Sequence, residues 1–497
     1  MEHILSRQEL YHDIFGSVLD RTEMTPYLLL RSIDYESALK RATRMMGNRG
    51  FDTLGKDELQ KSERERAQEY VERVYSYFLT WLFPFVKTQL RGLAALRSRN
   101  TALYRNCLKT IGEIESILNN AKFRNVAGKD PRHLFLLASS KKYPYVFSGN
   151  AEINMKVPAG WQQIACAMLK MGHLIKSIEE DSQDINDYAH LGFFLEMKGQ
   201  NLDDLYNYNW ESPVSLPEGE SAKRAFVKIS TFFHKLKESM TLDKKKKCLV
   251  FDSGDGVKVD IADIKARLKS PESMFTKLGK DVEGEAHDIR DILAITFILK
   301  SRDDTLTLFH ALQKRGVILQ ENTVSHSITQ TLFDNPESMI EAVRRLMVSL
   351  SHSEGRNEMP RKKELLANAK LFFKALSINA AKNLYTSQGH RKFQCKINFS
   401  LPIHRTAKTN KVIVPGTSLY VRRNRLNKKS QQHTLPVELR ITDEQSWQAS
   451  EQKGDSHHDA YKCRQLFFMM NRIFKPLFHF PKENFPRLRE DQVKLFP

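Results

Sequence analysis

The chain has 497 residues, of which 41% are hydrophobic and 28% charged. These values are typical of a soluble globular protein rather than a membrane protein, and the length predicts two or three domains. The formal net charge of +19 favours polyanionic partners such as nucleotides, RNA or an acidic membrane face. A solubilising surface explains that charge equally well.

Cysteine usage and hydropathy predict a cytoplasmic protein without a membrane segment. The cysteines are dispersed and form no CxxC pair, which argues against a disulfide framework or a structural zinc site. The N-terminus lacks the apolar run of a signal peptide. The longest apolar run, residues 74–86, is shorter than a bilayer span and contains Pro84, so it predicts a buried helix.

Residues 1–243 are expected to form a mainly α-helical domain whose role the sequence does not reveal. Apolar residues recur at helical spacing in segments 62–82 and 100–121, opposite charged faces. The dipeptide His12-Asp13 resembles the kernel of a metal-dependent phosphohydrolase. That chemistry needs a further upstream histidine at a distance, and only His3 precedes it, so a surface pair is the better interpretation.

Residues 244–475 are expected to form an α+β domain with a mixed sheet, followed by a C-terminal tail over residues 476–497. The lysine run 244–247 reads as a linker, and residues 253–256 as a hairpin turn. Period-two patterns predict strands at 292–300, 392–403, 411–414 and 435–441. Helical patterns predict helices at 303–314, 336–351, 361–384 and 456–475.

A basic strand followed by a helix start marks the first candidate site. Arg267 and Lys269 alternate with apolar residues, so a strand projects them from one face. Pro271 suits the first position of a helix, on which Ser273 and Lys277 share a face. Cations and a helix N-terminus together suit a polyphosphate, although a solvated basic face is favoured when this segment is taken alone.

Two acidic residues that border or lie in strands form the second candidate site. Asp291 opens an apolar strand, and Glu438 alternates with apolar residues in another. On neighbouring strands their carboxylates would share Mg²⁺, and Arg440 would steady negative charge on nucleotide phosphates. A half-exposed strand with a surface ion pair is the simpler interpretation of each residue alone. The loop 386–397, with Gly389 before a ring and a cation, suits stacking on a base.

In their order and spacing these segments resemble the synthetase domain of the RelA/SpoT homologue family, the alarmone synthetases, over about residues 250–470. The family's first motif reads Arg-x-Lys, with Ser four residues later and Lys after four more. Arg267, Lys269, Ser273 and Lys277 match it without a gap. This motif and the Val-Glu-Ile-Gln strand are the specific ones.

The remaining family motifs match in part. The Val-Glu-Ile-Gln strand is met by residues 437–440, and the Asp-Ile-x-Gly-x-Arg motif by residues 291–296. The Gly-Tyr-Arg-x-x-His loop is met by residues 389–394. The closing histidine, followed by Tyr-Lys, is met by His457 and residues 461–462.

The resemblance implies a nucleotidyltransferase-like enzyme that transfers pyrophosphate from ATP to the 3′-hydroxyl of GDP or GTP, making the (p)ppGpp alarmones of the stringent response. The residues implied to hold the ATP phosphates are Arg267, Lys269, Ser273 and Lys277. Those implied in Mg²⁺ binding and catalysis are Asp291, Glu438 and Arg440. Those implied in acceptor binding are Gly389, His390, Arg391, His457 and Lys462, with His390 stacking on the base.

The acceptor half departs from the family more than the donor half. Thr296 stands where the family has Arg, which removes a cation near the phosphates. His390 and Gln394 replace Tyr and His in the acceptor loop, Thr386 stands where Lys is usual, and Arg440 replaces Gln. These departures leave the identity of the acceptor open, and also whether activity survives them.

Three functions therefore remain open: alarmone synthesis, pyrophosphorylation of the tRNA 3′ end by a toxin-like relative, and a catalytically inactive nucleotide- or RNA-sensing module. The basic loop 420–430 suits an RNA backbone, and a solvated loop explains it equally well. Retention of both Asp291 and Glu438 argues against the inactive module. The sequence carries no signal for the oligomeric state.

Overall fold

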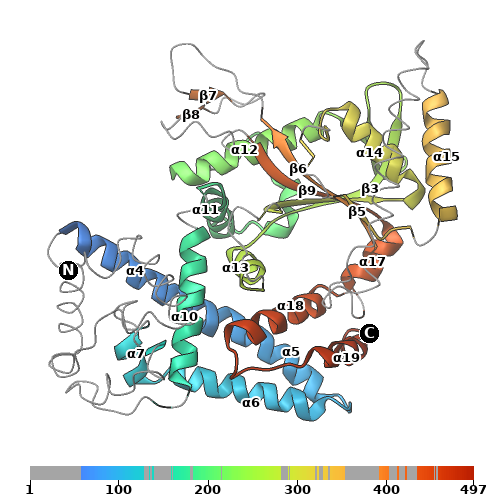
Figure 1. Ribbon diagram of the computed structural model, residues 1–497. Coiled ribbons are helices and arrows are strands. Elements are labelled where there is room, and N and C mark those ends of the chain that lie inside the picture. Colours follow the sequence, from blue (N-terminus) through green and yellow to red (C-terminus); the bar gives the residue numbers. More distant parts are fainter. Residues whose placement is uncertain are drawn as a thin grey trace, which may run out of the picture.

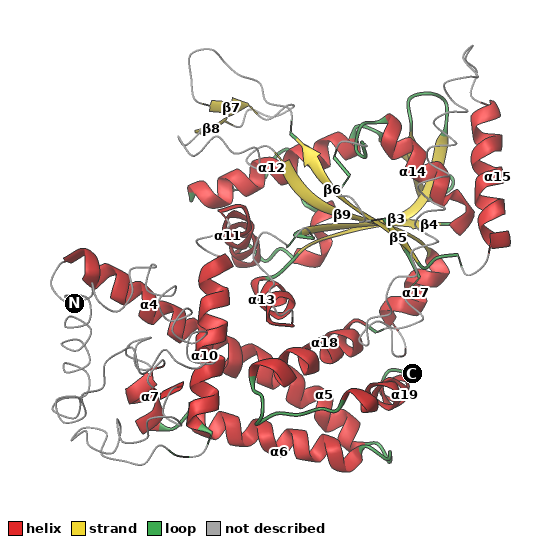
Figure 2. Cartoon of the chain, in the orientation of Figure 1, coloured by secondary structure: helices red, strands yellow, loops and turns green. Residues whose placement is uncertain are grey.

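The computed structural model describes most of the chain beyond residue 57. The described residues are 58–127, 134, 137–138, 158, 160–178, 183–213, 215–280, 289, 291–319, 322–323, 328–333, 336–352, 391–401, 411–413, 420–422, 434–452, 454 and 457–497. Within these parts the fold is α+β, as the sequence predicts, with strands gathered in one layer and helices around it (Figure 2).

A mixed sheet of seven strands forms the centre, in the order β1-β2-β3-β4-β9-β6-β5. Its strands are β1 Met240–Asp243, β2 Cys248–Asp252, β3 Lys258–Leu268, β4 Leu293–Leu299, β5 Thr329–Gln330, β6 Phe393–Ser400 and β9 Thr434–Asp443. β4 and β9 are parallel, and every other neighbouring pair is antiparallel. A separate hairpin joins β7, Lys411–Ile413, to β8, Tyr420–Arg422.

The two faces of the sheet differ in chemistry because polar and apolar residues alternate along its strands. On β6 the buried Phe393 and Phe399 face α12, Glu220–Lys237, and α14, Thr305–Lys314. Phe232 of α12 meets Phe399 edge to face at 5.0 Å, and Phe309 of α14 meets Phe393 at 5.3 Å. The opposite face is polar, and Figure 1 shows α13 and α18 on that side.

Helices from both ends of the chain form the layer beyond the polar face (Figure 1). The N-terminal elements are α4 Glu58–Ser76, η2 Tyr77–Leu82, α5 Phe83–Ala95, α6 Thr101–Leu118, α7 Ala121–Ala127, α10 Trp161–Lys176, α11 Gln183–Met197 and η4 Leu202–Asn207. The later ones are α13 Pro271–Lys280, α17 Glu444–Gln452, α18 His458–Ile473, η9 Lys482–Asn484 and α19 Phe485–Leu495. Two other elements, η6 Arg302–Asp304 and α15 Pro336–His352, lie beside α14 instead (Figure 1). No helix among the described residues is long and apolar enough to cross a membrane.

One hydrophobic core joins the helical layer to the sheet, with buried residues from α4 through α18 and α19. The C-terminal segment packs into it: Tyr104 Oη of α6 donates a hydrogen bond to Asp491 Oδ2 of α19 at 2.8 Å. The lysine run 244–247, expected as a linker, is the tight turn between β1 and β2. The segment expected as a tail and the expected domain boundary therefore both fall within continuous structure.

Most expected elements appear where the sequence predicts them. The turn at 253–256 connects the antiparallel β2 and β3. The strands expected at 292–300, 392–403, 411–414 and 435–441 correspond to β4, β6, β7 and β9, and three of the four expected helices to α14, α15 and α18. The helix expected at 361–384 and the His12-Asp13 dipeptide lie outside the described residues.

Candidate functional site

The first part of the site is built where β3 passes directly into α13. β3 alternates buried and half-buried residues, so Arg267 lies on the polar face while its apolar neighbours enter the core. The strand ends at Leu268, and Ser270 then accepts a hydrogen bond from the Ser273 backbone N–H at 3.4 Å. A serine before a first-turn proline is a typical helix start, and it brings the N-terminal turn of α13 to the end of the strand.

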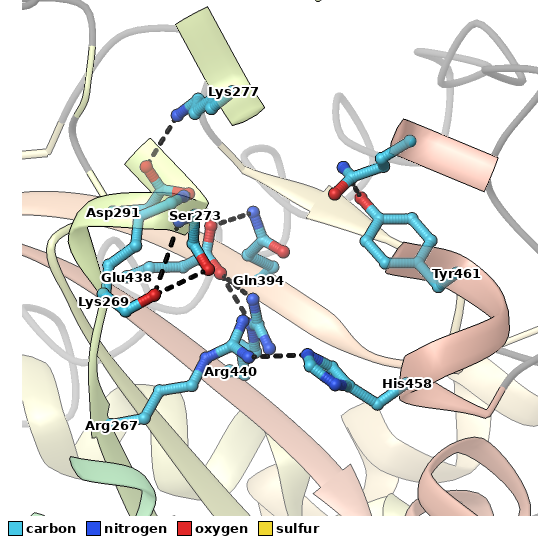
Figure 3. A network of polar contacts seen from close by, with 12 residues as sticks. Arg267, Lys269, Ser273, Lys277, Asp291, Gln394, Glu438, Arg440, His458 and Tyr461 are labelled. Atoms are coloured by element: carbon cyan, nitrogen blue, oxygen red, sulfur yellow. Dashed lines mark hydrogen bonds and ion pairs between the residues drawn. The ribbon is translucent and has the colours of Figure 1, made fainter. Parts of the chain in front are cut away.

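Asp291 lies between two lysines of this strand–helix unit (Figure 3). Lys269 Nζ donates to Asp291 Oδ2 at 2.5 Å, and Lys277 Nζ donates to Oδ1 at 2.6 Å. Burial disfavours the charge on Asp291, but the two ammonium groups outweigh it and hold its pKa below the usual range. Burial also lowers the pKa of Lys269 to about 8. Two cations around one acid leave this cluster with net positive charge.

Glu438, in the middle of β9, is the second buried acid. Only 4% of its side chain is exposed, and Arg440 Nε donates to its Oε1 at 2.6 Å, joined by Arg440 Nη2 on the same oxygen. Gln394 Nε2 of β6 donates to Oε2 at 2.9 Å. Burial alone would raise the pKa of Glu438, but Arg440 and Lys392 lower it to about 2. Glu438 is therefore ionised at neutral pH.

Strand register brings these groups together across the polar face. Ala294 of β4 is the partner of both Arg267 on β3 and Glu438 on β9. Two residues along, on the same face, Thr296 is the partner of Arg440. Cross-strand partners share a face, so the small side chains of β4 lie between the charged groups of β3 and β9.

The strand register also shows which side chains lie beside Thr296, the position at which the chain departs from the family motif. The resemblance places a cation at that position, and the chain has none there. Arg440 is the direct β9 partner of Thr296, and Gln394 is the β6 partner of Arg440. A guanidinium thus lies one strand away from the expected position, on the same face, and it is anchored to Glu438.

Lys392, which precedes β6, is a site residue that motif reading misses. Burial and the charges of Arg440, Arg267 and Lys396, opposed by that of Glu438, together lower its pKa to about 7. Its Nζ makes no hydrogen bond to any described residue. The local sequence signal is strand alternation: Lys392 lies two positions before Gln394 and so falls on the same face of the strand.

The start of α18 closes the site from the helical side. His457 was expected there, but its ring stacks on Phe496 at 4.2 Å, and its Nδ1 accepts from the Asp459 N–H as the helix N-cap. Its neighbour His458 faces the sheet instead, with Nε2 3.4 Å from Arg267 Nη1 (Figure 3). The difference arises because the helix begins between the two histidines and turns their rings in different directions.

The two further motif residues on α18, Tyr461 and Lys462, contact other side chains of the chain. Tyr461 Oη accepts a hydrogen bond from Gln465 Nε2 at 2.7 Å. Lys462, expected to bind the acceptor, has its Nζ 4.6 Å from the ring centre of Trp81 in the N-terminal helices. The structure therefore places the Lys462 ammonium against an aromatic ring of the helical layer.

The acceptor loop is only partly described. Gly389 and His390 lie outside the described residues, as does most of the basic loop 420–430. Arg391 is described, and its carbonyl accepts a hydrogen bond from Thr442 Oγ1 of β9 at 2.9 Å. The stacking role expected for His390 therefore stays a prediction.

The two carboxylates suit Mg²⁺ that arrives with a polyphosphate. The described residues contain no group of three or more Asp, Glu, His or Cys side chains placed to hold a metal ion alone. Mg²⁺ is commonly held by one or two carboxylates together with substrate phosphates and water, and Asp291 and Glu438 are such a pair. The two carboxylates interact electrostatically, because the negative charge of Asp291 raises the pKa of Glu438. All of their oxygens accept from protein side chains, so a metal ion shares these oxygens with, or displaces, Lys269, Lys277, Gln394 or Arg440.

Comparison with known proteins adds no relative to this description. No protein-family model, no curated protein and no solved structure matches the chain.

Proposed function

We propose that this protein transfers pyrophosphate from ATP to the ribose 3′-hydroxyl of GDP or GTP, on a nucleotidyltransferase-like sheet. One observation carries the proposal. Three elements that the resemblance names separately, the β3–α13 cations, Asp291 and Glu438, lie together on one polar face. Because Glu438 comes from a distant part of the chain, its meeting with the other two is independent support for a shared role.

The donor side is the positive cluster of β3 and α13. Arg267, Lys269 and Lys277 supply cations, and Ser273 supplies a hydroxyl at the start of a helix, where backbone N–H groups favour anions. A polyphosphate that bonds to Lys269 and Lys277 competes with Asp291 for them. Donor binding thereby frees the Asp291 carboxylate, which is one of the two groups suited to hold Mg²⁺.

The reacting groups meet over β4 and β9. The 3′-oxygen of the acceptor bonds to the β-phosphorus of ATP, the bond from that phosphorus to the α–β bridging oxygen breaks, and AMP leaves. Bound Mg²⁺ supplies charge neutralisation of the phosphates. Glu438 is ionised, and it accepts a hydrogen bond from the hydroxyl and orients it. With its pKa near 2, Glu438 is a weak base, so the hydroxyl proton passes to solvent as the new bond forms.

The acceptor side lies over the neighbouring strands β9 and β6. Arg440 and Lys392 face the position beside Glu438 and suit the acceptor's own phosphates. The ATP and Mg²⁺ that this reaction requires agree with the cytoplasmic location expected from the sequence.

The decisive experiment mixes purified protein with γ-labelled ATP, Mg²⁺ and either GDP, GTP or deacylated tRNA. We expect label on GDP or GTP, and a loss of about a thousandfold in Glu438→Gln, because a buried group at the reacting centre contributes on that scale. Glu444→Gln is the matched control, since Glu444 follows the same strand and is exposed. Label on tRNA alone would show that the acceptor is tRNA and not GDP or GTP. Label on none of the three would refute the proposal.

A further inference from the structure

The N-terminal helical layer contacts the phosphate-binding helix through an irregular turn. Between α4 and α5 the chain forms a π-helical turn, η2, at Tyr77–Leu82. Such turns are rare and are found frequently at functional sites. Here Tyr77 stacks on Trp81 with ring centres 5.3 Å apart, and Trp81 on Phe85 at 6.3 Å, which makes a continuous aromatic ridge.

Tyr77 is the contact from this ridge to α13. Its hydroxyl lies 3.2 Å from Thr276 Oγ1, and its ring meets Phe275 edge to face at 5.5 Å. The Thr276 hydroxyl already donates its single proton to the Glu272 carbonyl at 2.8 Å. The contact between the two hydroxyls holds α13 one residue before Lys277.

Trp81 is the contact from the ridge to α18. Lys462 Nζ lies 4.6 Å from its ring centre and 5.3 Å from that of Phe85, within the range of cation–π attraction. Lys462 is on the first turns of the helix that presents His458 to Arg267. The ridge thus touches both helices that border the polar face.

α13 and α18 are also joined directly at their far ends. Arg472 Nη1 donates to the Gly279 carbonyl at 3.2 Å. A Cβ on Gly279 would lie 2.9 Å from Met469 Cγ, so the two helices approach closely only because this residue is glycine. The hydroxyl of Tyr77 also lies 3.5 Å from Met469 Sδ, so one residue of the ridge contacts both helices.

We propose that the N-terminal helical layer is a working part of the phosphate-binding site, in which Tyr77 is a positioning residue that holds α13 so that Ser273 and Lys277 face the donor phosphates. The naming of the ligand rests on the proposed function; the positioning of α13 does not. The layer is then no detachable regulatory domain. Its contribution to binding is orientation, since Tyr77 contacts Thr276 and Phe275 of α13 and Met469 of α18 rather than Ser273 or Lys277.

Tyr75 supplies a matched control for Tyr77. Both tyrosines are 4% exposed and lie one turn or less apart on the same run of helix. The Tyr75 hydroxyl has no hydrogen-bond partner among the described residues. Tyr75→Phe and Tyr77→Phe therefore remove the same atom from equally buried sites, and only the second removes a contact with α13.

The test uses the full-length protein and two measurements: amide hydrogen exchange of α13, and calorimetric affinity for inorganic tripolyphosphate. We expect Tyr77→Phe to speed exchange in α13 and to weaken binding about three- to tenfold, the equivalent of one buried hydrogen bond. Thr276→Val should act alike, and the effect of the double variant should be smaller than the sum of the two single effects, because both remove the same contact. Tyr75→Phe should change neither measurement.

Equal behaviour of Tyr77→Phe and Tyr75→Phe in α13 exchange and in tripolyphosphate affinity would overturn the inference. A wild-type protein that binds no tripolyphosphate would count against the donor site proposed above. The exchange measurement would still decide on Tyr77 in that case, because it needs no ligand.

Discussion

The two halves of the polar face are built in different ways. On the donor side one acid, Asp291, is shared by Lys269 and Lys277, which come from a strand and the helix that directly follows it. On the acceptor side Glu438 is held by Arg440 of its own strand and by Gln394 of a strand distant in the chain. The first half has an excess of cations around its acid, whereas the second is a closely satisfied buried pair.

This difference separates the tasks that each half can perform. Because Asp291 is bonded to two lysines, one of them can leave without exposing an unpaired buried charge. The donor cluster is therefore suited to exchange partners with an incoming phosphate. Glu438 is hydrogen-bonded to one cation, Arg440, and to the neutral Gln394, and breaking this buried ion pair is costly. Glu438 is thus suited to remain fixed while ligands are rearranged around it.

The largest expected effect compares loss of one cation in each half. Arg440→Met should reduce the free energy of unfolding by about 3 kcal/mol, because it leaves the buried Glu438 carboxylate without its cation. Lys277→Met should cost less than about 1 kcal/mol, because Asp291 keeps Lys269. Urea denaturation measures both, with Arg440→Lys as the control that keeps the charge. Equal costs for the two Met variants would remove the distinction between the halves.

An intermediate effect probes the exchange of partners at Asp291. Asp291→Asn releases Lys269 and Lys277, so affinity for tripolyphosphate without metal should rise about tenfold, while Mg²⁺-dependent transfer is lost. Calorimetry with and without Mg²⁺ reports the two effects separately. Asp263→Asn is the control, since this acid pairs with Lys265 at 2.9 Å on the same strand but is half exposed. Unchanged or weaker binding in Asp291→Asn would contradict the competition described here.

The smallest expected effect concerns pH on the acceptor side. The pKa of Lys392 falls from an ordinary 10.5 to about 7 in the folded chain, so its charge is present below pH 7 and lost above it. Lys392 faces Arg440, Glu438, Arg267 and Lys396, and an acceptor phosphate should bind more weakly as pH rises through 7.

Lys392→Gln should therefore raise the KM for GDP about three- to tenfold at pH 6 and leave it nearly unchanged at pH 8.5. Steady-state kinetics at both pH values check this. Between pH 7 and 10.5 the folded state has released the Lys392 proton while the unfolded chain still holds it. The free energy of unfolding therefore rises with pH through that window. A KM effect of Lys392→Gln that is equal at the two pH values would exclude its titration as the cause.

The donor half of the polar face is also more predictable from the sequence than the acceptor half. The β3–α13 unit is local: strand alternation, a serine and a first-turn proline predict both elements and the shared face of Ser273 and Lys277. The meeting of Asp291 and Glu438 depends on β4 and β9 being adjacent. Sequence patterns predict those strands, but strand order is a property of the folded sheet.

The positions that sequence does not predict are those set by neighbours from elsewhere. Lys392 gains its low pKa from burial and from the charge of Arg440 on a neighbouring strand, and no local pattern reveals that the two segments are neighbours. His458 rather than His457 faces Arg267 because of where the helix begins, and helix ends are uncertain by a residue or two in any pattern. The contact of Tyr77 with Thr276 joins segments that share no local signal.

The parallel pairing of β4 with β9 has a consequence for the timing of biosynthesis. Val437 and Leu293 are register partners, and the intervening chain contributes α14, β5, α15 and β6 before β9 is made. A ribosome-bound chain therefore displays Asp291 and the donor lysines long before Glu438 emerges. The pair of carboxylates exists only after this late, long-range strand addition, so a nascent or truncated chain is expected to bind phosphate without being able to transfer it.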